Sequence, residues 1–545
     1  MEPFLVTEEK KRRYTEAGYW GLPTLPEVFE NQTSKYQERE VFVDSANRMT
    51  FAQAERYVDR LALGFAELGF EKDDIVLIQL PNIIESALLR LAVPKVGVLA
   101  IMVMFAFDVN EVKHILKQTE ARGIVIPWKF REKDYFKIYQ EIQTEMSHME
   151  RIFVVGDEIP EGAVSIKEMM ERPIEEEYPS DHLAERSITT WEVQELQTTT
   201  GSTGLPKISE GFGWYQLQGH TIGARLNATD DDIIGFVVPY IGGPGNCLWC
   251  VGLANGCKMV FLERFDPEDA LELVEKEKIT ILAGVPTVGE KLVRVNGLQQ
   301  YDLSSLRVFY SAGAPMPPSL AVEIEEKMGC KVVSILGAMD FGPISIPSVD
   351  DPPEVRHYSL GRPLPGNEIR ILDEDGEEVP QGEEGELVCR GPHGSSGYYK
   401  MPGASLKAYG GDKDGWFRIQ DLVRLDENGY LHIAGRLKDI IKRGAMTIAP
   451  VEIEDLLRTH PAVEDVAVIP IPDTVLGEKV CAVVIPSGGK EITFKEMISF
   501  LRGKGLTTFK FPEILEFVDT FPMKGGQKVA KRDLVDNILK RQASG

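Results

Sequence analysis

The chain has 545 residues, with 60 Lys and Arg against 85 Asp and Glu, which gives a formal net charge of −25. Its length exceeds one compact core of roughly 150 residues, and 43% hydrophobic and 27% charged residues are ordinary for a folded protein, so a disordered or fibrous chain is excluded. The acidic excess disfavours a nucleic-acid partner, because a phosphate backbone repels such a surface.

The beginning of the chain is charged at 8–13, without an apolar stretch before it, so we predict no secretory signal. The longest apolar run, 96–107, is too short to span a bilayer and predicts a buried helix end followed by a strand. We therefore expect a cytoplasmic protein without a membrane partner. Six cysteines do not make a disulfide framework, and buried free thiols are favoured over a zinc site at Cys247, Cys250 and Cys257.

The first predicted helix begins after Thr50, where Gln53 completes a capping box and apolar residues recur at helical spacing up to Leu68. The pattern then alternates between strands and helices for about 270 residues. Predicted strands are 76–80, 123–127, 233–238, 258–262, 279–283, 308–310 and 332–335, and helical stretches include 84–98, 267–278 and 317–328. This alternation predicts an α/β fold with largely parallel sheets.

Turn signals crowd together after about Gly361, and short strands between them predict a β-barrel-like subdomain. The pattern changes again near 436–439. A helix is predicted from Pro450 through Arg458, followed by strands at 467–471 and 480–485, a helix at 494–502 and a strand at 516–518. We therefore expect a large N-terminal domain at 1–435, a joint at 436–439 and a small α+β C-terminal domain at 440–545.

The segment 198–207 combines hydroxyl side chains, two glycines and a lysine between a strand-like and a helix-like run. Glycines allow backbone N–H groups to turn inward, and the hydroxyl groups and Lys207 add donors and charge, so the loop is suited to phosphate oxygens. It is not a Walker A loop, because Gly201 and Gly204 are too close together and Ile208 follows the lysine. An ordinary polar surface turn is the alternative.

This loop resembles the phosphate-binding loop of the adenylate-forming enzymes, which include acyl-CoA synthetases, adenylation domains of peptide synthetases and beetle luciferases. The resemblance covers nearly the whole chain. Residues 17–20 and 509–512 are most similar to aryl-acid–AMP ligases and cyclic-acid CoA ligases. It implies a large AMP-binding domain and a mobile C-terminal domain, with ATP, Mg²⁺ and coenzyme A as cofactors, a small carboxylic acid as substrate, and a monomer or homodimer.

The resemblance also implies a nucleotide site. Asp340 stands where the family has a glutamate that holds Mg²⁺, Asp421 matches the residue that binds the ribose hydroxyls, and Gln420 replaces the family's glycine before it. Leu336 replaces the family's aromatic residue. The implied ATP- and AMP-binding residues are Thr199, Thr200, Gly201, Ser202, Thr203, Lys207, Gly313, Ala314, Pro315, Gly337, Ala338, Met339, Asp340, Asp421 and Arg436.

Three lysines are implied in catalysis. Lys528 matches the family's C-terminal catalytic lysine, although Gln527 replaces the glycine before it. Lys438 falls at the hinge about which the small domain turns, and Lys442 begins the loop that lines the pantetheine tunnel after the turn. The implied CoA-binding residues are Lys442, Arg443, Gly444 and Ala445. A basic surface turn is the alternative for this loop.

The acid pocket is expected around 239–243. Gly243 stands where the dihydroxybenzoate branch has an asparagine, so the amide that would select an ortho hydroxyl is missing. Two adjacent glycines also open volume, so we expect an apolar acid: alicyclic, simple aromatic or short-to-medium aliphatic. The candidate pocket residues are Tyr240, Gly242, Gly243, Gly313, Met339 and Phe341, with ordinary core packing as the alternative.

The resemblance implies ATP-dependent formation of an acyl-adenylate followed by thioester formation with coenzyme A. One alternative is an aryl-acid–AMP ligase that loads a carrier-protein thiol, although no carrier domain is fused to this chain. Another is a non-catalytic binding protein that retains the fold, a possibility that the departures at Asp340, Gln420 and Gln527 leave open.

Overall fold

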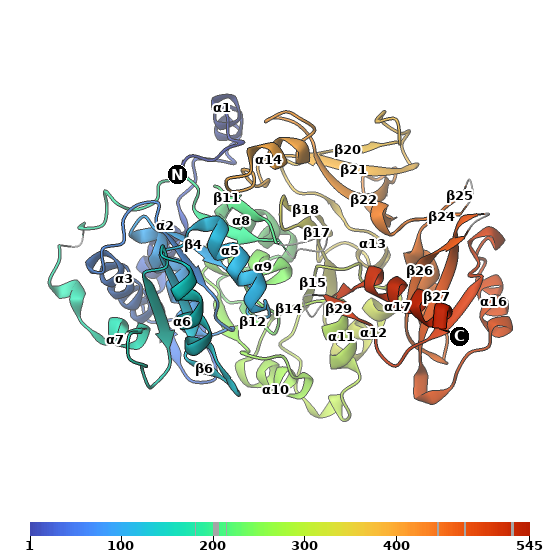
Figure 1. Cartoon of the computed structure of the whole chain (residues 1–545), viewed down its shortest axis with the longest axis horizontal. Helices are drawn as coiled ribbons and strands as arrows, with labels where there is room; N and C mark the ends of the chain where they lie inside the picture. The colour runs from blue at the N-terminus through green and yellow to red at the C-terminus, as the bar shows by residue number, and fades with distance from the viewer. Residues whose placement is uncertain are drawn as a thin grey trace. The chain divides into compact units, whose positions relative to one another are not determined.

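The computed structural model describes residues 1–179, 181–199, 206–213, 215–443, 446–473, 476–524 and 528–544. The chain divides into two compact units. The first unit comprises Met1–Met316, Leu320–Glu368 and Arg390–Phe417; the second comprises Pro317–Ser319, Ile369–Cys389 and Arg418–Gly545. Figure 1 labels their helices and strands.

The first unit contains two seven-stranded sheets. One has the order β16-β15-β14-β12-β13-β1-β2, parallel from β16 to β1 with β2 as an antiparallel edge. Its strands are β1 (Glu40–Val43), β2 (Arg48–Thr50), β12 (Ile233–Phe236), β13 (Lys258–Phe261), β14 (Ile281–Gly284), β15 (Val308–Ser311) and β16 (Lys331–Ser334).

The other sheet has the order β11-β10-β4-β3-β5-β8-β9 and is parallel except for the β10–β11 pair. Its strands are β3 (Ile75–Ile78), β4 (Leu99–Met102), β5 (Gly123–Pro127), β8 (Arg151–Val155), β9 (Val164–Ser165), β10 (Glu195–Thr198) and β11 (Ile208–Gly211). The predicted parallel α/β architecture is confirmed.

Side chains of this second sheet alternate between two hydrophobic cores. Val76 and Ile78 of β3 belong to the core that also contains the strands of the other sheet, whereas Ile75 and Leu77 belong to a separate core on the opposite face. Both faces of the sheet are therefore buried, which explains why its strands read as continuous apolar runs rather than alternating ones.

Helices cover the sheets. In the first core, α2 packs against α3, α4 and α9, and α8 packs against α9; α5 and α6 contribute to the second core. The predicted capping box is present at α3, where Thr50 Oγ1 accepts from Gln53 N–H. The helices of this part of the chain are α1 (Glu8–Glu16), α2 (Leu25–Tyr36), α3 (Phe51–Glu67), α4 (Ile84–Lys95), α5 (Val109–Thr119), α6 (Tyr135–Glu145), α7 (Ile166–Glu171), α8 (Tyr215–Leu226), α9 (Gly243–Asn255), α10 (Pro267–Glu277), α11 (Pro286–Val293), α12 (Pro318–Met328), α13 (Pro353–Tyr358) and α14 (Pro402–Ala408).

The turn-rich region forms two smaller sheets. Strands β17 (Leu336–Ala338), β18 (Gly342–Ile346) and β19 (Arg362–Pro363) make a three-stranded sheet, and β20 (Glu368–Leu372), β21 (Glu384–Arg390), β22 (Phe417–Leu425) and β23 (Leu431–Arg436) make a four-stranded one. The strands expected between turns are present, and those of the described residues form two separate sheets; the barrel-like closure stays a prediction.

The C-terminal part contains two hydrophobic clusters of its own. Its sheet consists of β24 (Ile441–Arg443), β25 (Met446–Ile448), β26 (Val463–Asp473), β27 (Gly477–Pro486) and β28 (Ile514–Phe517). The remaining elements are α15 (Pro450–Arg458), α16 (Phe494–Gly503), α17 (Lys531–Ser544) and the hairpin of β29 (Met523–Lys524) and β30 (Lys528–Val529). All six cysteines of the chain are buried, and Cys247, Cys250 and Cys257 are free thiols, as expected.

Candidate active site

The predicted site segments of the first unit follow the carboxyl ends of parallel strands. Gly242 and Gly243 come after β12, Gly313 after β15 and Thr199 after β10. Open α/β sheets bind ligands at this edge, because the loops after neighbouring parallel strands meet there. The topology therefore supports the grouping made from the sequence.

The predicted phosphate loop is closed at its base like a hairpin. Thr199 N–H donates to the Lys207 carbonyl at 2.9 Å, and Lys207 N–H donates to Thr199 Oγ1 at 3.0 Å. Both residues thus extend the β10–β11 pair into the loop. Thr200, Gly201, Ser202 and Thr203 lie outside the described residues, so their phosphate contacts stay a prediction.

Lys207, Tyr398 and Asp340 come together beside this loop. The Lys207 ammonium lies 4.5 Å from the centre of the Tyr398 ring, and the Tyr398 hydroxyl donates to Asp340 Oδ2 at 2.6 Å. Burial and the Asp340 carboxylate raise the pKa of Tyr398, so its hydroxyl stays protonated as a donor. Tyr398 was not predicted from the sequence, where its signal is the aromatic pair Tyr398-Tyr399 after Gly397.

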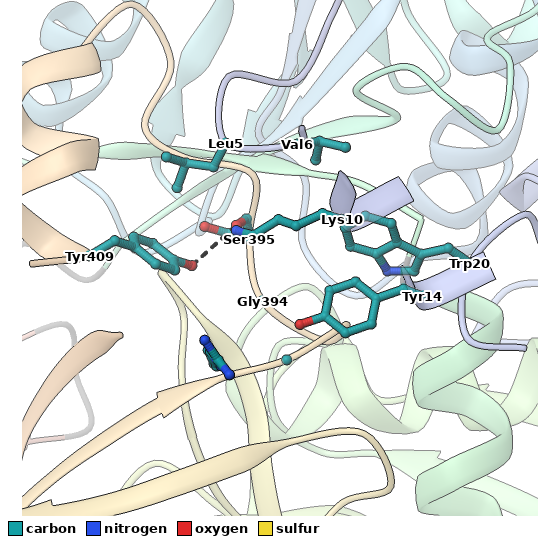
Figure 2. A pocket seen from close by; sticks show the side chains of 10 residues that line it. Leu5, Val6, Lys10, Tyr14, Trp20, Gly394, Ser395 and Tyr409 are labelled. Atoms are coloured by element: carbon teal, nitrogen blue, oxygen red, sulfur yellow. Dashed lines mark hydrogen bonds between the residues drawn. The ribbon is translucent and has the colours of Figure 1, made fainter. Parts of the chain in front are cut away.

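The segment that carries Tyr398 is fastened to β11 and to Asp340. Tyr399 N–H donates to the Ile208 carbonyl at 2.8 Å, and Ser395 Oγ donates to the Asp340 carbonyl at 3.0 Å. Figure 2 shows the cavity beside it, where the Tyr409 hydroxyl donates to the Ser395 carbonyl at 3.2 Å. Burial of Lys10, which lines that cavity, lowers its pKa to about 8. The candidate metal ligand Asp340 is thus held through a hydrogen-bonded frame.

Glu210 on β11 connects the first residues of the chain to the segment that carries Tyr398. Its Oε2 accepts from Phe4 N–H at 3.1 Å and from Ser396 Oγ at 3.4 Å. The carboxyl is buried, and burial raises its pKa to about 7. Glu210 therefore changes charge near neutral pH, three residues after Lys207.

The predicted acid side is built from glycines and methionines. Gly243 N–H donates to Met339 Sδ at 3.3 Å, which brings two of the predicted pocket residues together. A Cβ placed on Gly242 would lie 3.2 Å from Met104 Sδ, whereas one on Gly243 would meet nothing within 4 Å. The apolar thioethers of Met104 and Met339 therefore lie next to the two glycines.

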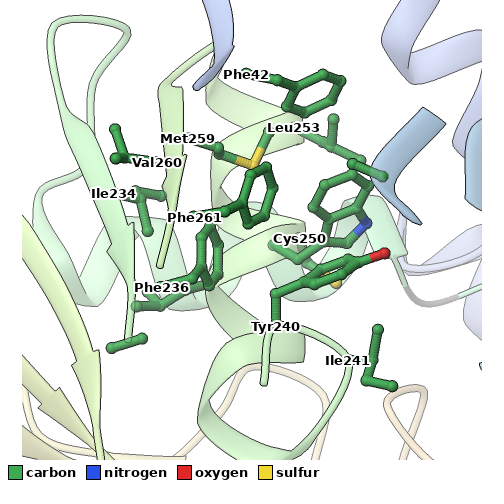
Figure 3. Close-up of a cluster of buried hydrophobic side chains, with 14 of the residues drawn as sticks. Phe42, Ile234, Phe236, Tyr240, Ile241, Cys250, Leu253, Met259, Val260 and Phe261 are labelled. Carbon is green, nitrogen blue, oxygen red and sulfur yellow. The ribbon is translucent and has the colours of Figure 1, made fainter. Parts of the chain in front are cut away.

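Other predicted pocket residues lie in different surroundings. Tyr240 is 1% exposed; its ring packs against Phe236 and Phe261, and its hydroxyl bonds Ser86 Oγ at 2.9 Å. Figure 3 shows Tyr240 within this aromatic cluster. Phe341 is also buried and packs against Phe417. Both side chains lie in the core, the alternative weighed for them from the sequence.

Gly313 and Gly337, two of the predicted nucleotide-binding residues, stand where a side chain would be strained or would clash. Gly313 has a φ of +87°, and the neighbouring Ala314 and Pro315 are exposed. At Gly337, next to Ala338 in β17, a Cβ would lie 2.8 Å from the Gly342 carbonyl oxygen, so a side chain would separate β17 from β18. The exposed backbone at Gly313 and Gly337 is available to a ligand.

A buried ion pair and its hydrogen bond to Asn246 connect the strand before the phosphate loop with the helix that begins at Gly243. Arg90 on α4 bonds Glu195 on β10 at 2.6 and 2.9 Å and the Asn246 side chain on α9 at 2.6 Å. Strand β10 leads into the phosphate loop and α9 begins at Gly243. Removing one partner of such a pair leaves a buried unpaired charge, which costs about 3–5 kcal/mol.

In the second unit, the structure brings the predicted ribose residues together. Asp421 and Arg436 are direct partners in the β22–β23 ladder, and Arg436 Nε lies 2.9 Å from Asp421 Oδ1. Gln420 has a φ of +65°, the left-handed conformation that glycine adopts most easily. The glutamine thus keeps the backbone conformation expected of the family's glycine.

The predicted CoA loop and catalytic lysines are described in part. Lys442 Nζ pairs with Glu374 Oε1 at 2.6 Å, and Arg443 pairs with Glu513. Gly444 and Ala445 lie outside the described residues. Lys438 stands in the single helical turn Leu437–Asp439, and Lys528 is the cross-strand partner of Lys524 in the β29–β30 hairpin, but neither lysine has a described side chain. Their roles remain predictions.

Comparison with known proteins places the whole chain. Residues 29–399 match the family model described as AMP-binding enzyme, and residues 452–528 match AMP-binding enzyme C-terminal domain. A 2,3-dihydroxybenzoate-AMP ligase of Bacillus subtilis (strain 168) is 30% identical, with 99% of this chain and 98% of the relative covered. A medium-chain fatty-acid–CoA ligase of Escherichia coli (strain K12) is 27% identical over 98% and 94%.

A solved structure is also similar to this chain over nearly its whole length. The ATP-bound MatB of Rhodopseudomonas palustris superposes with a TM-score of 0.82 at 26% identity, covering 94% of this chain and 98% of that one.

Among the described residues, no helix is both long and apolar enough to cross a membrane. The same residues contain no group of three or more His, Cys, Asp or Glu placed to hold a metal.

Proposed function

The chain belongs to the AMP-binding enzyme family and is an adenylate-forming ligase, and we propose that it converts a small apolar carboxylic acid first to an acyl-adenylate and then to an acyl-CoA thioester. The observation that carries this proposal is the meeting of Lys207, Tyr398 and Asp340 at one edge, with the predicted acid residues Gly243 and Met339 also in contact there.

In the first step, a carboxylate oxygen of the acid attacks the α-phosphorus of ATP and pyrophosphate leaves. Catalysis of such a transfer consists mainly of positioning and charge neutralisation. Lys207 and the loop before it would hold the β- and γ-phosphates. Lys528 would place a point charge between the α-phosphate and the attacking carboxylate, a task that suits a long and flexible ammonium side chain.

The residues present fit a magnesium ion. Mg²⁺ binds through one or two carboxylates together with substrate phosphates and waters, so a single protein carboxylate beside the phosphate loop is sufficient. Asp340 would hold the ion, and its position is fixed by the hydroxyl of Tyr398. Bound Mg²⁺ supplies neutralisation of the triphosphate charge.

In the second step, the thiol of coenzyme A attacks the acyl carbonyl and AMP leaves. We propose that the C-terminal domain turns about 436–439 between the steps, with Lys438 at the hinge and the loop from Lys442 to Ala445 at the pantetheine. The turn Leu437–Asp439 joins two regions with separate sheets, which supports a hinge at this point.

The acid class follows from the side chains around the glycine pair. Met104 and Met339 offer no strong hydrogen-bond donor, and a polar group buried against thioethers would lose its bonds to water. We therefore propose an alicyclic, simple aromatic or short-to-medium aliphatic acid. A carrier-protein thiol is the second candidate acceptor, favoured by the similarity to a 2,3-dihydroxybenzoate-AMP ligase.

The test is pyrophosphate release from ATP and Mg²⁺ with a panel of carboxylic acids, followed by addition of free coenzyme A. Release with one or more apolar acids and a CoA thioester as product is the expected result. Release without a thioester on free CoA favours the carrier-protein acceptor. If no acid causes pyrophosphate release, the result contradicts the proposed enzymatic function and favours a binding protein with this fold.

A further inference from the structure

Met104 is the part of the acid side that the sequence did not single out. It follows β4 of one sheet, whereas Gly242 follows β12 of the other, so the two meet only through the fold. A Cβ on Gly242 would lie 3.2 Å from Met104 Sδ and 3.6 Å from its Cε. The thioether therefore faces the glycine directly.

Met104 lies between the two hydrophobic cores of the first unit. It packs against both hydrophobic cores of the first unit and is only partly buried. Across the glycine pair, Met339 Sδ accepts from Gly243 N–H. Two unbranched thioethers, one after β4 and one between β17 and β18, thus lie against adjacent glycines.

We propose that Met104 determines which acids are accepted, by forming with Met339 an adjustable end of the acid pocket that yields to the apolar tail of the substrate. This inference rests on the proposed function. Methionine has three rotatable side-chain bonds and adapts to irregular shapes, so it can move aside where a branched residue would clash. An apolar tail binds more tightly with each CH₂ group that it buries, which favours a tail that reaches the thioethers.

The alternative is that Met104 only fills the core between the two sheets. In that case its truncation lowers stability and slows all acids equally. A role in selection instead changes the ratio of kcat/KM between acids, because that ratio reports differential binding of the substrates' own groups.

The experiment measures pyrophosphate release with straight-chain acids from acetate to decanoate, benzoate and cyclohexanecarboxylate. We expect Met104→Ala to raise the kcat/KM ratio of longer to shorter acids by about tenfold. This is the discrimination that one or two methylene groups provide in an apolar pocket. Gly242→Ala should act in the opposite direction, since its Cβ pushes on the thioether. Met104→Leu conserves volume but is branched and stiffer, so it should lower the ratio of longer to shorter acids below that of the wild type.

A matched control exists elsewhere in the first unit. Met169 on α7 also faces a glycine, with its Cε 2.7 Å from a Cβ placed on Gly64 of α3, and Met169→Ala should leave the acid ratio unchanged. Melting curves confirm folding of each variant, and Gly242→Ala provides the test if Met104→Ala does not fold. An unchanged ratio in the folded variants overturns this inference while the wild-type activity stands; a wild type inert toward every acid overturns the proposed function and this inference with it.

Discussion

The two sides of the candidate active site in the first unit differ in the kinds of side chain that form them and in the contacts that hold these side chains. On the phosphate side, Lys207, Tyr398 and Asp340 are held by hydrogen bonds and a ring contact. On the acid side, a glycine pair without side chains lies against the thioethers of Met104 and Met339. Under the proposed function, directional bonds fix the groups that every turnover needs, whereas flexible apolar groups leave room for selection among acids. The first side should therefore set the rate for all acids, and the second side the preference among them.

The largest expected effect is that of Lys528→Ala. Loss of the point charge at the reacting phosphate should slow adenylation by roughly 10²–10³-fold for every acid, while thioester formation from a supplied acyl-adenylate is kept. Pyrophosphate exchange and thioester formation are measured separately. Lys524→Ala, the cross-strand partner in the same hairpin, is the matched control. Equal loss in both half-reactions would contradict the assignment of Lys528 to the first step alone.

Tyr398→Phe removes the hydroxyl that bonds Asp340 but keeps the ring under Lys207. A hydrogen bond to a charged group contributes about 1.5–3 kcal/mol, so we expect kcat/KM for adenylation to fall by roughly 10- to 100-fold. The acid preference should not change. Tyr399→Phe changes the adjacent residue in the same way and serves as control. A shift in the ratio between acids would show that the two sides are not separable as described.

Gly243→Asn tests the acid side. The position has a φ of +21° and open space around a Cβ, and asparagine tolerates such backbone conformations better than most residues. The amide should hold an ortho hydroxyl and raise the kcat/KM ratio of salicylate to benzoate by about tenfold. Gly243→Ala fills space without an amide and should not raise it. A ratio equal to that of the wild type would place Gly243 away from the acid.

The smallest expected effect comes from Glu210, which supports the phosphate side without touching Asp340 directly. Burial raises its pKa to about 7 in the folded chain, so the native state binds a proton more tightly than the unfolded state. The carboxyl therefore costs the folded state stability as pH rises from about 4.5 to 7, by roughly 3 kcal/mol at most.

Glu210→Gln keeps an acceptor for Phe4 N–H but does not ionise. We expect its melting temperature relative to the wild type to rise between pH 5 and pH 8, with no change in acid preference. Melting curves across that range, beside Glu9→Gln as an exposed control, provide the measurement. A constant difference at all pH values would mean that Glu210 does not titrate there.

The fold was largely predictable because its signals are local. The apolar strand runs and the capping box at Thr50 depend on neighbouring residues, and they appear in the structure close to where they were expected. The helix expected at 84–98 ends earlier, at Lys95, after Pro94, which cannot continue the backbone hydrogen bonding. Helices with fewer apolar positions, such as α1 and α17, were not predicted.

The site was predictable only where the family resemblance supplied it. Asp421 and Arg436 meet across one ladder, and Gly243 meets Met339, as the grouping from the sequence implied. Tyr398 and Met104 were missed, because each reaches the site from a distant part of the chain and its neighbours there are set by strand order rather than by spacing. A local pattern carries no information about such contacts.

The most direct test of the central claim follows one oxygen atom. If the chain forms an acyl-adenylate from the acid and then a CoA thioester, an acid labelled with ¹⁸O in its carboxylate must leave one labelled oxygen in the AMP released. Mass spectrometry of the nucleotide after a single round of reaction with a preferred apolar acid, ATP, Mg²⁺ and coenzyme A gives the answer. We predict AMP with one ¹⁸O and a thioester that retains the other; unlabelled AMP, or label found in inorganic phosphate, would contradict the account.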